Sequence, residues 1–486
     1  MAFFEIIGNV GDEMMTRNAQ GIIRNARVLD PVNGVNRIAD LLFDKGQIVE
    51  LDPSEAIVAT HEVDATGLLV VPGIIDIHVH ASPWLGGRHA HKMLAMAGVT
   101  TALEMAGPID GMIDIATNFG AGLNMACINY VRPEHTVDST DPGASELRDL
   151  LNASLDKGAI GLKLLGGHYP LTPDATAATI RVAAEAGAYV AFHAGTLESG
   201  SHIEGMIEAC DLAARNPLHL PHINSYTRGA KRGAMEEGEL ALSTLLQHPN
   251  IWSESYLSPI NAASAKCSNG APDSLTTRVC LERGGYAPDE AGLEKAISDG
   301  WALLNVESDD SVELAVGPDA VRAWRDADTN LGVSFAVNPS EPRLRLATAR
   351  TAERGFVVDA LATDGGGIPR NVIIDMGLSL VRLDAISIED FVVKSSVTPA
   401  RILGLTSKGH LGPGADADIT IIDVERQRPV ASFVAGEPVL CNGRVVGTGT
   451  RLITTPQGHK AAVAHGIAGP IVELGKMLPD RKIAAT

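Results

Sequence analysis

Two rhythms of apolar and polar residues divide the chain. Between residues 70 and 405, apolar runs of strand length alternate with alanine-rich helical segments, a pattern typical of repeated strand–helix units. Helices are expected at 176–186 and 201–214. Eight strands in series predict an α/β fold, a (β/α)8 TIM barrel with catalytic groups at the carboxyl ends of its strands. The predicted strands are 70–77, 98–104, 124–130, 159–164, 188–193, 218–222, 251–256 and 357–364.

The segments on either side of this region alternate over shorter distances and predict a second domain of β structure. Residues 39–49 indicate a hairpin that turns near Lys45-Gly46, and Asn442-Gly443 is a strong turn signal for another hairpin. Both termini are therefore expected to build one β-sandwich domain. The predicted boundaries are 1–18 for an N-terminal extension, 19–69 plus 406–486 for the β domain, and 70–405 for the barrel.

One connection in the predicted barrel is much longer than the others. Residues 258–355 separate the seventh and eighth strands, and a link of roughly 100 residues far exceeds a normal loop. It includes a helical segment at 293–302. We interpret it as an inserted subdomain, either a lid or a peripheral decoration.

Charge and composition narrow the expected partners. The chain has 59 acidic and 39 basic residues and a formal net charge of -20, which disfavours nucleic acid and anionic membranes as partners. The 5 cysteines are scattered and form no Cys-x-x-Cys pair, which argues against disulfides and a zinc knuckle. No apolar run reaches the length of about 18 residues that a membrane span needs. We expect a cytoplasmic homo-oligomer that acts on a small molecule.

The candidate chemistry begins with His78 and His80, which end the first predicted strand. Residues i and i+2 of a strand point to the same side, so both imidazoles can reach one metal ion. A pair of hydrogen-bonded core histidines is the alternative. Further polar residues end other predicted strands: Lys163, His193, His222 and Asp364. Imidazole and carboxylate groups together favour zinc or another divalent metal.

Each of these residues has a simpler explanation when taken alone. A histidine at a strand end can be a scaffold residue, and an aspartate before glycines can be a turn former. A lysine within an apolar strand is costly unless it is paired or chemically altered. On the sixth strand, His219 and His222 point to opposite sides, and we favour His222 because it lies nearer the strand's end.

Taken together, these residues resemble the amidohydrolase superfamily over nearly the whole chain. The run Pro72 to His80, PGIIDIHVH, resembles the family's first-strand motif, and Gly409 to Asp418 resembles its return into the β domain. The resemblance implies two divalent metals, His78, His80 and Asp364 on one, and His193 and His222 on the other. It also implies that Lys163 is N6-carboxylated and bridges both. An unmodified Lys163 would leave a mononuclear site.

The resemblance further implies hydrolysis of a C–N amide bond. Two metals would activate a bridging water and polarise the carbonyl, and Asp364 would carry the proton to the leaving nitrogen. The insertion and the strand around Cys127 resemble the D-aminoacylase branch, whose substrates are N-acyl amino acids. Lys163 instead resembles the dihydroorotase, hydantoinase and isoaspartyl dipeptidase branches, and a cyclic amidase of the hydantoinase, dihydroorotase or lactamase type is the alternative. A heterocycle deaminase and a non-catalytic hydantoinase-like scaffold are less favoured alternatives.

Several polar residues near the predicted metal strands are candidates for substrate contacts. A substrate carboxylate would need a cation, for which Arg228 and Arg370 are candidates; a solvated arginine is the alternative for each. The predicted substrate-binding residues are Glu104, His168, Tyr169, Asn224, Tyr226 and Arg228.

Overall fold

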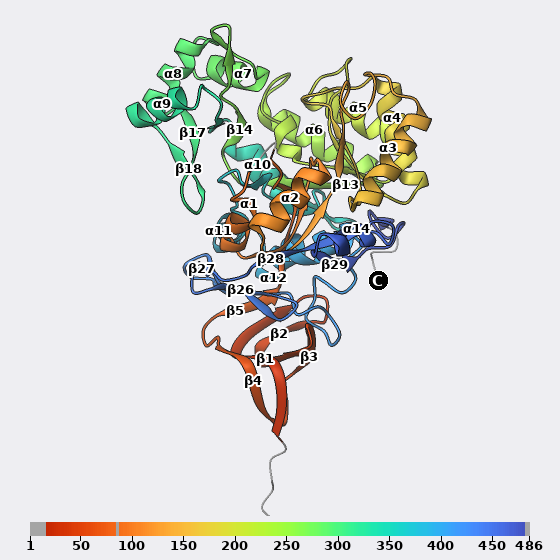
Figure 1. Cartoon of the computed structure of the whole chain (residues 1–486), viewed down its shortest axis with the longest axis vertical. Coiled ribbons are helices and arrows are strands. Elements are labelled where there is room, and N and C mark those ends of the chain that lie inside the picture. The colour runs from red at the N-terminus through yellow and green to blue at the C-terminus, as the bar shows by residue number, and fades with distance from the viewer. Residues whose placement is uncertain (1–15, 84–86, 482–486) are drawn as a thin grey trace, which may run out of the picture.

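The computed structural model describes residues 16–83 and 87–481 and shows a mixed α/β fold with a β domain at one end (Figure 1). The predicted extension, residues 1–18, lies outside the described residues except for its last three, which begin a strand instead. The β domain is a nine-stranded sheet. Its strands, in spatial order, are β27 (Arg444–Val445), β26 (Glu437–Cys441), β25 (Arg428–Val434), β24 (Ile419–Asp423), β5 (Leu69–Pro72), β1 (Thr16–Asp30), β2 (Val35–Asp44) and β3 (Gln47–Leu51), with β4 (Ala56–Asp64) beside β1.

Both predicted hairpin turns of this domain are confirmed. Lys45 and Gly46 join β2 to β3, and Asn442 and Gly443 join β26 to β27. All four residues have positive φ angles, which the tight turns of hairpins require. The sheet encloses an apolar core in which the rings of Phe43 and Phe433 lie 5.6 Å apart.

Parallel strands form the second part of the molecule. Two sheets of parallel pairs share contiguous stretches of chain, because one residue separates β8 from β9 and two separate β22 from β23. Since β23 pairs with β6, the order of neighbours returns to its first strand. These strands are β6 (Ile74–His80), β7 (Val99–Glu104), β8 (Ala121–Cys127), β9 (Asn129–Val131), β10 (Gly161–Leu165), β11 (Tyr189–His193), β12 (Leu218–Leu220), β13 (Ile251–Tyr256), β22 (Ala360–Ala362) and β23 (Gly365–Gly366).

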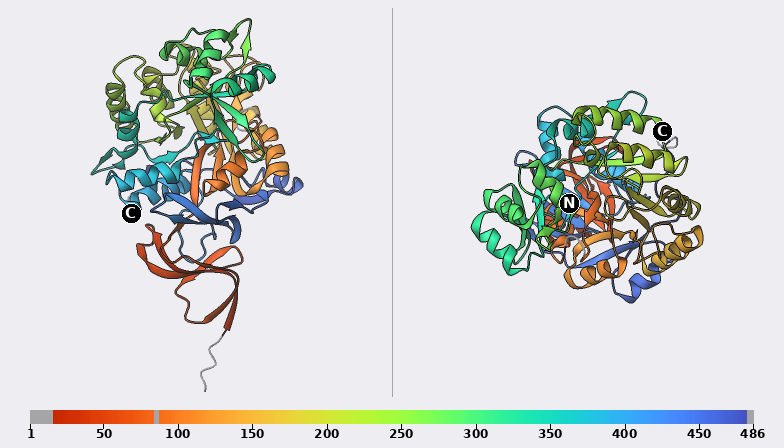
Figure 2. Two further views of the ribbon diagram at one scale, coloured as in Figure 1. Left: turned by 90° about the vertical axis from the view of Figure 1, so that its left-hand side faces the viewer. Right: turned by 90° about the horizontal axis from the view of Figure 1, so that it is seen from above.

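Helices cover the outer face of the parallel strands (Figure 2). In α3, for example, Leu147, Leu151 and Leu155 repeat every four residues and are buried, so one apolar stripe faces the sheet. These helices are α1 (Ala90–Met96), α2 (Ile109–Phe119), α3 (Ala144–Lys157), α4 (Pro173–Glu185), α5 (Ile203–Ala213), α6 (Ala234–Gln247), α10 (Ser340–Thr348), α11 (Ile373–Arg382), α12 (Ile388–Val392) and α13 (Thr398–Ile402), with a π-helix at Val393–Val397.

The predicted first strand is divided between the two domains. β5 belongs to the β domain and β6 to the parallel strands, with Gly73 between them. A Cβ atom at Gly73 would lie 2.2 Å from Oγ1 of Thr100, so only glycine allows the close approach. Because β6 starts at the β domain, the carboxyl ends of the parallel strands point away from it.

The C-terminal boundary is a correction to the predicted β domain. The prediction places all of 406–486 there, but β28 (Gly449–Thr454) and β29 (Ala468–Ile471) extend the parallel sheet beside β8, with α14 (His459–Ala464) between them. Further on, Arg481 forms an ion pair with Asp359, and its guanidinium lies 4.3 Å from the ring centre of Trp252. The end of the described chain is thus bound to the parallel strands.

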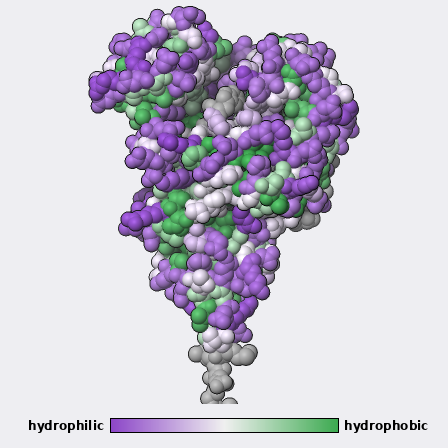
Figure 3. Space-filling view, viewed as in Figure 1, coloured by the Kyte–Doolittle hydropathy of each residue, from purple (hydrophilic) through white to green (hydrophobic). Residues whose placement is uncertain are grey.

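The insertion between β13 and β22 has its own antiparallel sheet and core, around Trp324 and Phe335. This subdomain includes fewer residues than the predicted 258–355. Helix α10, near the end of that range, packs on α6 and β13 and so belongs with the parallel strands and their helices. In the space-filling view a notch separates the insertion from helices α3 to α6 (Figure 3). Its main elements are β14 (Asn261–Ser264), α7 (Leu275–Arg283), α8 (Glu290–Asp299), β17 (Ala302–Glu307), β18 (Val312–Ala315), α9 (Gly317–Asp326) and β19 (Gly332–Phe335).

Candidate metal centre

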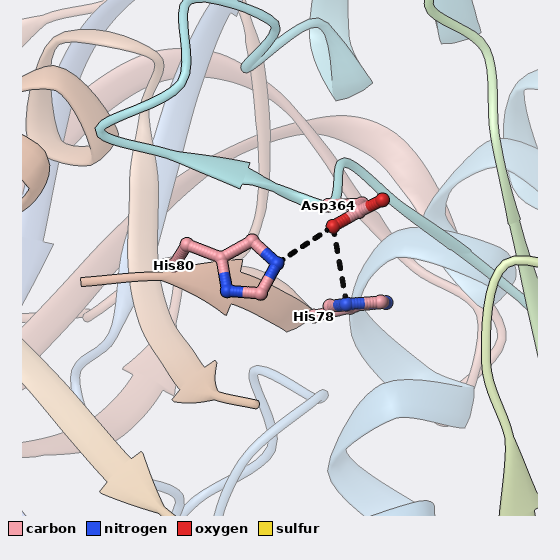
Figure 4. A group of neighbouring side chains, drawn as sticks. All are labelled: His78, His80 and Asp364. Atoms are coloured by element: carbon pink, nitrogen blue, oxygen red, sulfur yellow. Dashed lines mark hydrogen bonds and ion pairs between the residues drawn. The ribbon is translucent and has the colours of Figure 1, made fainter. Parts of the chain in front are cut away.

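Three predicted ligands meet at the carboxyl ends of β6 and β22 (Figure 4). Oδ1 of Asp364 lies 2.9 Å from Nε2 of His80 and 3.2 Å from Nε2 of His78. The ligand atoms of all three residues lie within 4.8 Å of one another. Two imidazole nitrogens and a carboxylate oxygen converging in this way match the donor set of a first-row divalent metal.

The backbone around Asp364 brings the carboxylate to the histidines. Asp364 has φ 52°, and its N–H donates to the carbonyl of His78 at 2.8 Å. At Gly366, a Cβ atom would lie 2.2 Å from the carbonyl oxygen of His80. The glycines after Asp364 therefore let this loop approach β6 closely.

The outer oxygen of Asp364 is bound to Arg370, whose side chain is 3% exposed. Nη2 of Arg370 lies 2.6 Å from Oδ2 of Asp364, and its Nε–H and Nη1–H donate to the carbonyls of Asp364 and Ile260. Burial by itself would raise the pKa of Asp364. The charge of Arg370, the nearby imidazole of His78 and the hydrogen bond with His80 outweigh this effect. Together they hold the pKa of Asp364 well below its ordinary value.

His193 and His222 form a second group beside the first. Their rings lie 4.5 Å apart, and the ring of His222 is 5.1 Å from that of His78. His193 ends β11, and its Nε2 lies 2.9 Å from Oγ of Ser201. His222 follows β12 with φ 40° and precedes the one-turn helix η1 (Ile223–Tyr226). Burial lowers the pKa of His78, His193 and His222, which favours the neutral imidazole that binds metals.

Lys163 points into the same interior from β10. It is 3% exposed, and its Nζ has no hydrogen-bond partner among residues 16–83 and 87–481. Burial lowers the pKa of Lys163 to about 7, opposed by the charges of Asp364, Glu254 and Glu104. Near neutral pH, a large share of this side chain is consequently an uncharged amine.

Glu254 is a buried carboxylate at the centre that the sequence analysis missed. It lies on β13, and its Oε1 is 2.7 Å from Nδ1 of His78 and accepts the backbone N–H of His222 at 2.8 Å. Burial raises the pKa of Glu254. The glutamate within the predicted strand 251–256 was the only signal in the sequence, and an alternating strand can equally direct such a residue to solvent.

Unpaired buried atoms around this interior fit a bound metal. Within the described part of the chain, the atoms without a hydrogen-bond partner include Nδ1 of His222 and Nζ of Lys163. Buried polar atoms without partners are costly, and ligands are one way to satisfy them. The donor set is therefore suited to divalent metal.

Comparison with known proteins decides the family. The model of the "Amidohydrolase family" matches residues 69–446, which include all of these residues. The chain belongs to the amidohydrolase family. It is thus a metal-dependent hydrolase acting on carbon–nitrogen bonds.

Two curated relatives belong to the branches that the sequence resembles. The N-acyl-D-glutamate deacylase of Alcaligenes xylosoxydans xylosoxydans is 24% identical over 470 residues, which are 87% of this amidohydrolase and 93% of the relative. The dihydroorotase of Streptococcus pneumoniae is 30% identical over 147 residues, 29% of this chain but only 34% of that protein.

Solved structures support the fold. The N-acyl-D-glutamate deacylase of Bordetella bronchiseptica, complexed with zinc and a phosphonate inhibitor, matches with a TM-score of 0.62 and 16% identity. The match covers 90% of this amidohydrolase and 99% of that chain. No helix within residues 16–83 or 87–481 of this amidohydrolase has the length and apolar character to span a membrane.

The choice between His219 and His222 agrees with the packing. The ring of His222 lies 5.1 Å from that of His78 and 4.5 Å from that of His193, whereas Nδ1 of His219 lies 2.7 Å from the hydroxyl of Tyr189. The amidohydrolase thus brings the predicted ligand His222, rather than His219, to the centre.

Three of the predicted substrate-binding residues form hydrogen bonds with the backbone. Glu104 accepts the N–H groups of Ala81, Ala106 and Gly107, which fixes the loops after β6 and β7. Asn224 exchanges two hydrogen bonds with the backbone of Tyr256, and the hydroxyl of Tyr226 accepts the N–H of Ala194. Their first role is to hold the strand ends in place, and contact with substrate stays a prediction.

The other predicted substrate-binding residues are His168, Tyr169 and Arg228. The ring of His168 is 5.3 Å from that of His193, and the guanidinium of Arg132 lies 4.2 Å from the ring centre of Tyr169. Arg228 follows η1 and donates to oxygens of Ser225, Tyr256, Asn261 and Asn338. Of the two predicted cations, Arg370 is bound to Asp364, whereas Arg228 forms no ion pair within the described residues.

Proposed function

We propose that this amidohydrolase hydrolyses the linear amide bond of a small N-acyl amino acid. The supporting observation is Arg228, a half-buried cation whose hydrogen-bond partners in the described chain are all neutral oxygens. It follows His222 in sequence, and its charge acts on His193 and Tyr226. A substrate carboxylate would supply the missing counter-charge. The similarity to an N-acyl-D-glutamate deacylase supports the same substrate class.

We assign the ligands to two divalent metals, with zinc as the expected element. His78, His80 and Asp364 would hold one ion, and His193 and His222 the other. Addition of carbon dioxide to the neutral amine of Lys163, with release of one proton, would give an anionic carbamate that could hold both ions. It would also remove the cost of a buried amine that has no partner among the described residues. When bound, the metals would lower the pKa of a water molecule and polarise the amide carbonyl.

The protein's own groups would then move the proton. Asp364 is the proposed general base, and it is ionised because Arg370 lies against its outer oxygen. It would take the proton of the attacking water and deliver it to the leaving nitrogen. The parallel strands that return to β6 support the finer prediction of a (β/α)8 barrel with this site at the carboxyl ends of its strands.

A cyclic amide is the second candidate substrate. Lys163 lies on β10, the fourth strand of the predicted barrel, and resembles branches that include hydantoinase and dihydroorotase; a dihydroorotase is among the relatives. Ring opening of such a substrate would use the same ligands and the same base, but it would leave Arg228 without a carboxylate unless the ring carries one.

A metal measurement and a substrate screen test these proposals. Elemental analysis of the reconstituted protein should find about two divalent ions per chain, as in two-metal hydrolases. N-acyl-D- and N-acyl-L-amino acids should be hydrolysed faster than hydantoins, dihydroorotate and lactams. A protein that binds no divalent metal would disprove the function, and a preference for cyclic amides would support the second candidate.

A substitution at Arg228 tests the assignment of the substrate carboxylate. Arg228→Met should raise KM for N-acyl amino acids by about 10- to 100-fold, the equivalent of a lost charge-assisted hydrogen bond. The KM for the matching N-acyl amino amides, which lack the carboxylate, should stay unchanged. Arg345→Met is the control, because Arg345 is an exposed arginine paired with Glu239. Equal effects on acids and amides would contradict the assignment.

A further inference from the structure

Glu254 lies between the two groups of predicted ligands. It comes from the middle of β13, whose six residues are all buried, and its own side chain is 0% exposed. One oxygen, Oε1, contacts both a ring nitrogen of His78 and the backbone N–H of His222. These two histidines belong to different groups and come from β6 and the end of β12. A single carboxylate oxygen therefore connects both halves of the centre.

The contact with His78 determines which ring nitrogen faces the ligand position. Nδ1 of His78 lies toward Glu254 at 2.7 Å, and Nε2 lies toward Asp364 at 3.2 Å. A carboxylate on Nδ1 keeps a proton on that nitrogen, so the lone pair for a metal is on Nε2. For His80, Nε2 also faces Asp364, but Nδ1 has no partner among the residues that the structure describes. Of the two histidines, His78 is thus the one with an anchored ring.

Other buried carboxylates of the chain have a different environment. Glu237 is also 0% exposed, and it accepts the backbone N–H groups of Gly229, Lys231 and Arg232. Its role is to fix a loop, and it contacts no predicted ligand in the described residues. Glu254 instead binds a ligand ring, and its Oε2 has no partner within residues 16–83 and 87–481. Stabilising the backbone does not account for this arrangement.

We propose that Glu254 is the positioning residue of the metal centre, which holds His78 with Nε2 toward the metal and fixes His222 through its backbone N–H. This inference rests on the proposed metal-dependent hydrolysis and adds a residue to it. Glu254 acts through the two histidines and is not itself a ligand. Its loss should weaken metal binding first and lower the reaction rate as a consequence.

The test compares metal affinity in three variants. Glu254→Gln keeps the shape and one acceptor oxygen but loses the charge, so the Kd for zinc, measured by competition with a chelator, should rise about tenfold. Glu254→Ala removes the acceptor as well and should raise it about 100-fold. Glu237→Gln is the matched control and should leave the Kd unchanged. The visible spectrum of the cobalt-loaded protein should change in the Glu254 variants and not in the control.

The melting temperature of the metal-free protein separates positioning from a merely structural role. Metal-free Glu254→Gln should melt at or above the wild-type temperature, because a buried carboxylate is costly without cations nearby. Glu237→Gln should melt lower. A Kd within about twofold of wild type in both Glu254 variants would overturn the proposal, since the loss of such a partner costs at least tenfold. A weaker Kd with an equal loss of metal-free stability would overturn it too. If the wild-type protein itself binds no metal, the proposed function fails, which is a distinct outcome.

Discussion

Two buried lysines, in different regions of the molecule, differ in whether the Nζ atom has partners. At the carboxyl ends of the parallel strands, Nζ of Lys163 has no hydrogen-bond partner in the described chain. At the seam with the β domain, Nζ of Lys408 contacts the carboxylates of Asp416 and Asp418, and Asp418 also accepts from Asn124. Both lysines are at most 5% exposed. The two lysines are therefore similar in burial and differ in whether carboxylates lie within reach of Nζ.

The partners of Lys408 indicate a structural role for the seam, whereas the unpaired groups around Lys163 indicate a binding site. At the seam, the partners of Lys408 offset the cost of burying its charge, and the cluster joins elements far apart in the chain. Around Lys163, several buried donors and acceptors have no hydrogen-bond partner among the described residues. A folded protein that leaves such groups open gains from a ligand that satisfies them.

The largest expected effect comes from replacing Lys163. Lys163→Ala should abolish the bridge between the proposed metals and lower kcat/KM by about 10³-fold or more, the equivalent of several kcal/mol of transition-state stabilisation. The metal-free protein should remain as stable as wild type, because Nζ of Lys163 has no hydrogen-bond partner to lose within residues 16–83 and 87–481. Metal analysis, kinetics and urea unfolding measure the three quantities. Partial recovery of activity with a short carboxylic acid would support the bridge, and unchanged activity would refute it.

The reciprocal replacement at the seam should affect stability instead. Lys408→Met leaves Asp416 and Asp418 without their cation and should lower the free energy of unfolding by about 3–5 kcal/mol. The kcat/KM of the folded fraction should match that of wild type. Urea unfolding monitored by circular dichroism gives the free energy of unfolding, and initial rates divided by the concentration of folded enzyme give kcat/KM. A catalytic defect without a loss of stability would invalidate the comparison.

A third buried lysine, Lys394, has a neutral partner instead of a carboxylate. We expect it to make the stability of the protein depend on pH. Lys394 is 0% exposed, its Nζ donates to the carbonyl of Val358 at 2.6 Å, and burial lowers its pKa to about 7. Between pH 7 and 10 the unfolded chain holds this proton and the folded chain releases it, so this lysine makes stability rise with pH. Relative to Lys394→Met, wild type should gain up to about 1.4 kcal/mol per pH unit over this range. A constant difference between the two proteins would show that the lysine titrates normally.

The smallest effect is expected at the surface. Lys92 of α1 pairs with Asp310 in the turn between β17 and β18, and the Asp310 side chain is 74% exposed. Lys92→Ala should leave the melting temperature unchanged at physiological salt, because exposed ion pairs are screened and weak. Calorimetry measures this quantity. A clear loss of stability would mean that the insertion is held to the parallel strands mainly by this contact.

Local patterns were enough to predict much of this site. The spacing of His78 and His80, a lysine within an apolar run and an aspartate before glycines each involve a few neighbouring residues, and the predicted strands place them at one end of the fold. The structure brings His78, His80 and Asp364 within ligand distance of one another. The ligand roles themselves, and the carboxylation of Lys163, stay predictions.

The residues that were missed depend on contacts across the fold. Glu254 and His78 are 176 residues apart, and an acidic residue in an alternating strand also fits a solvent-facing position. Arg370 could be predicted as a cation near the site, but not as the partner of Asp364. Similarly, residues 449–454 have a strand pattern that fits either domain, and only the register with β8 assigns them to the parallel sheet.

The contacts of the C-terminal segment also determine when the parallel strands can be completed during synthesis on the ribosome. β8 obtains its neighbour β28 only after residue 454 has been made, and Asp359 obtains Arg481 later still. Until then, a nascent chain exposes the free edge of β8, and exposed strand edges favour aggregation. Efficient production of this protein should therefore depend on chaperones that shield the growing chain.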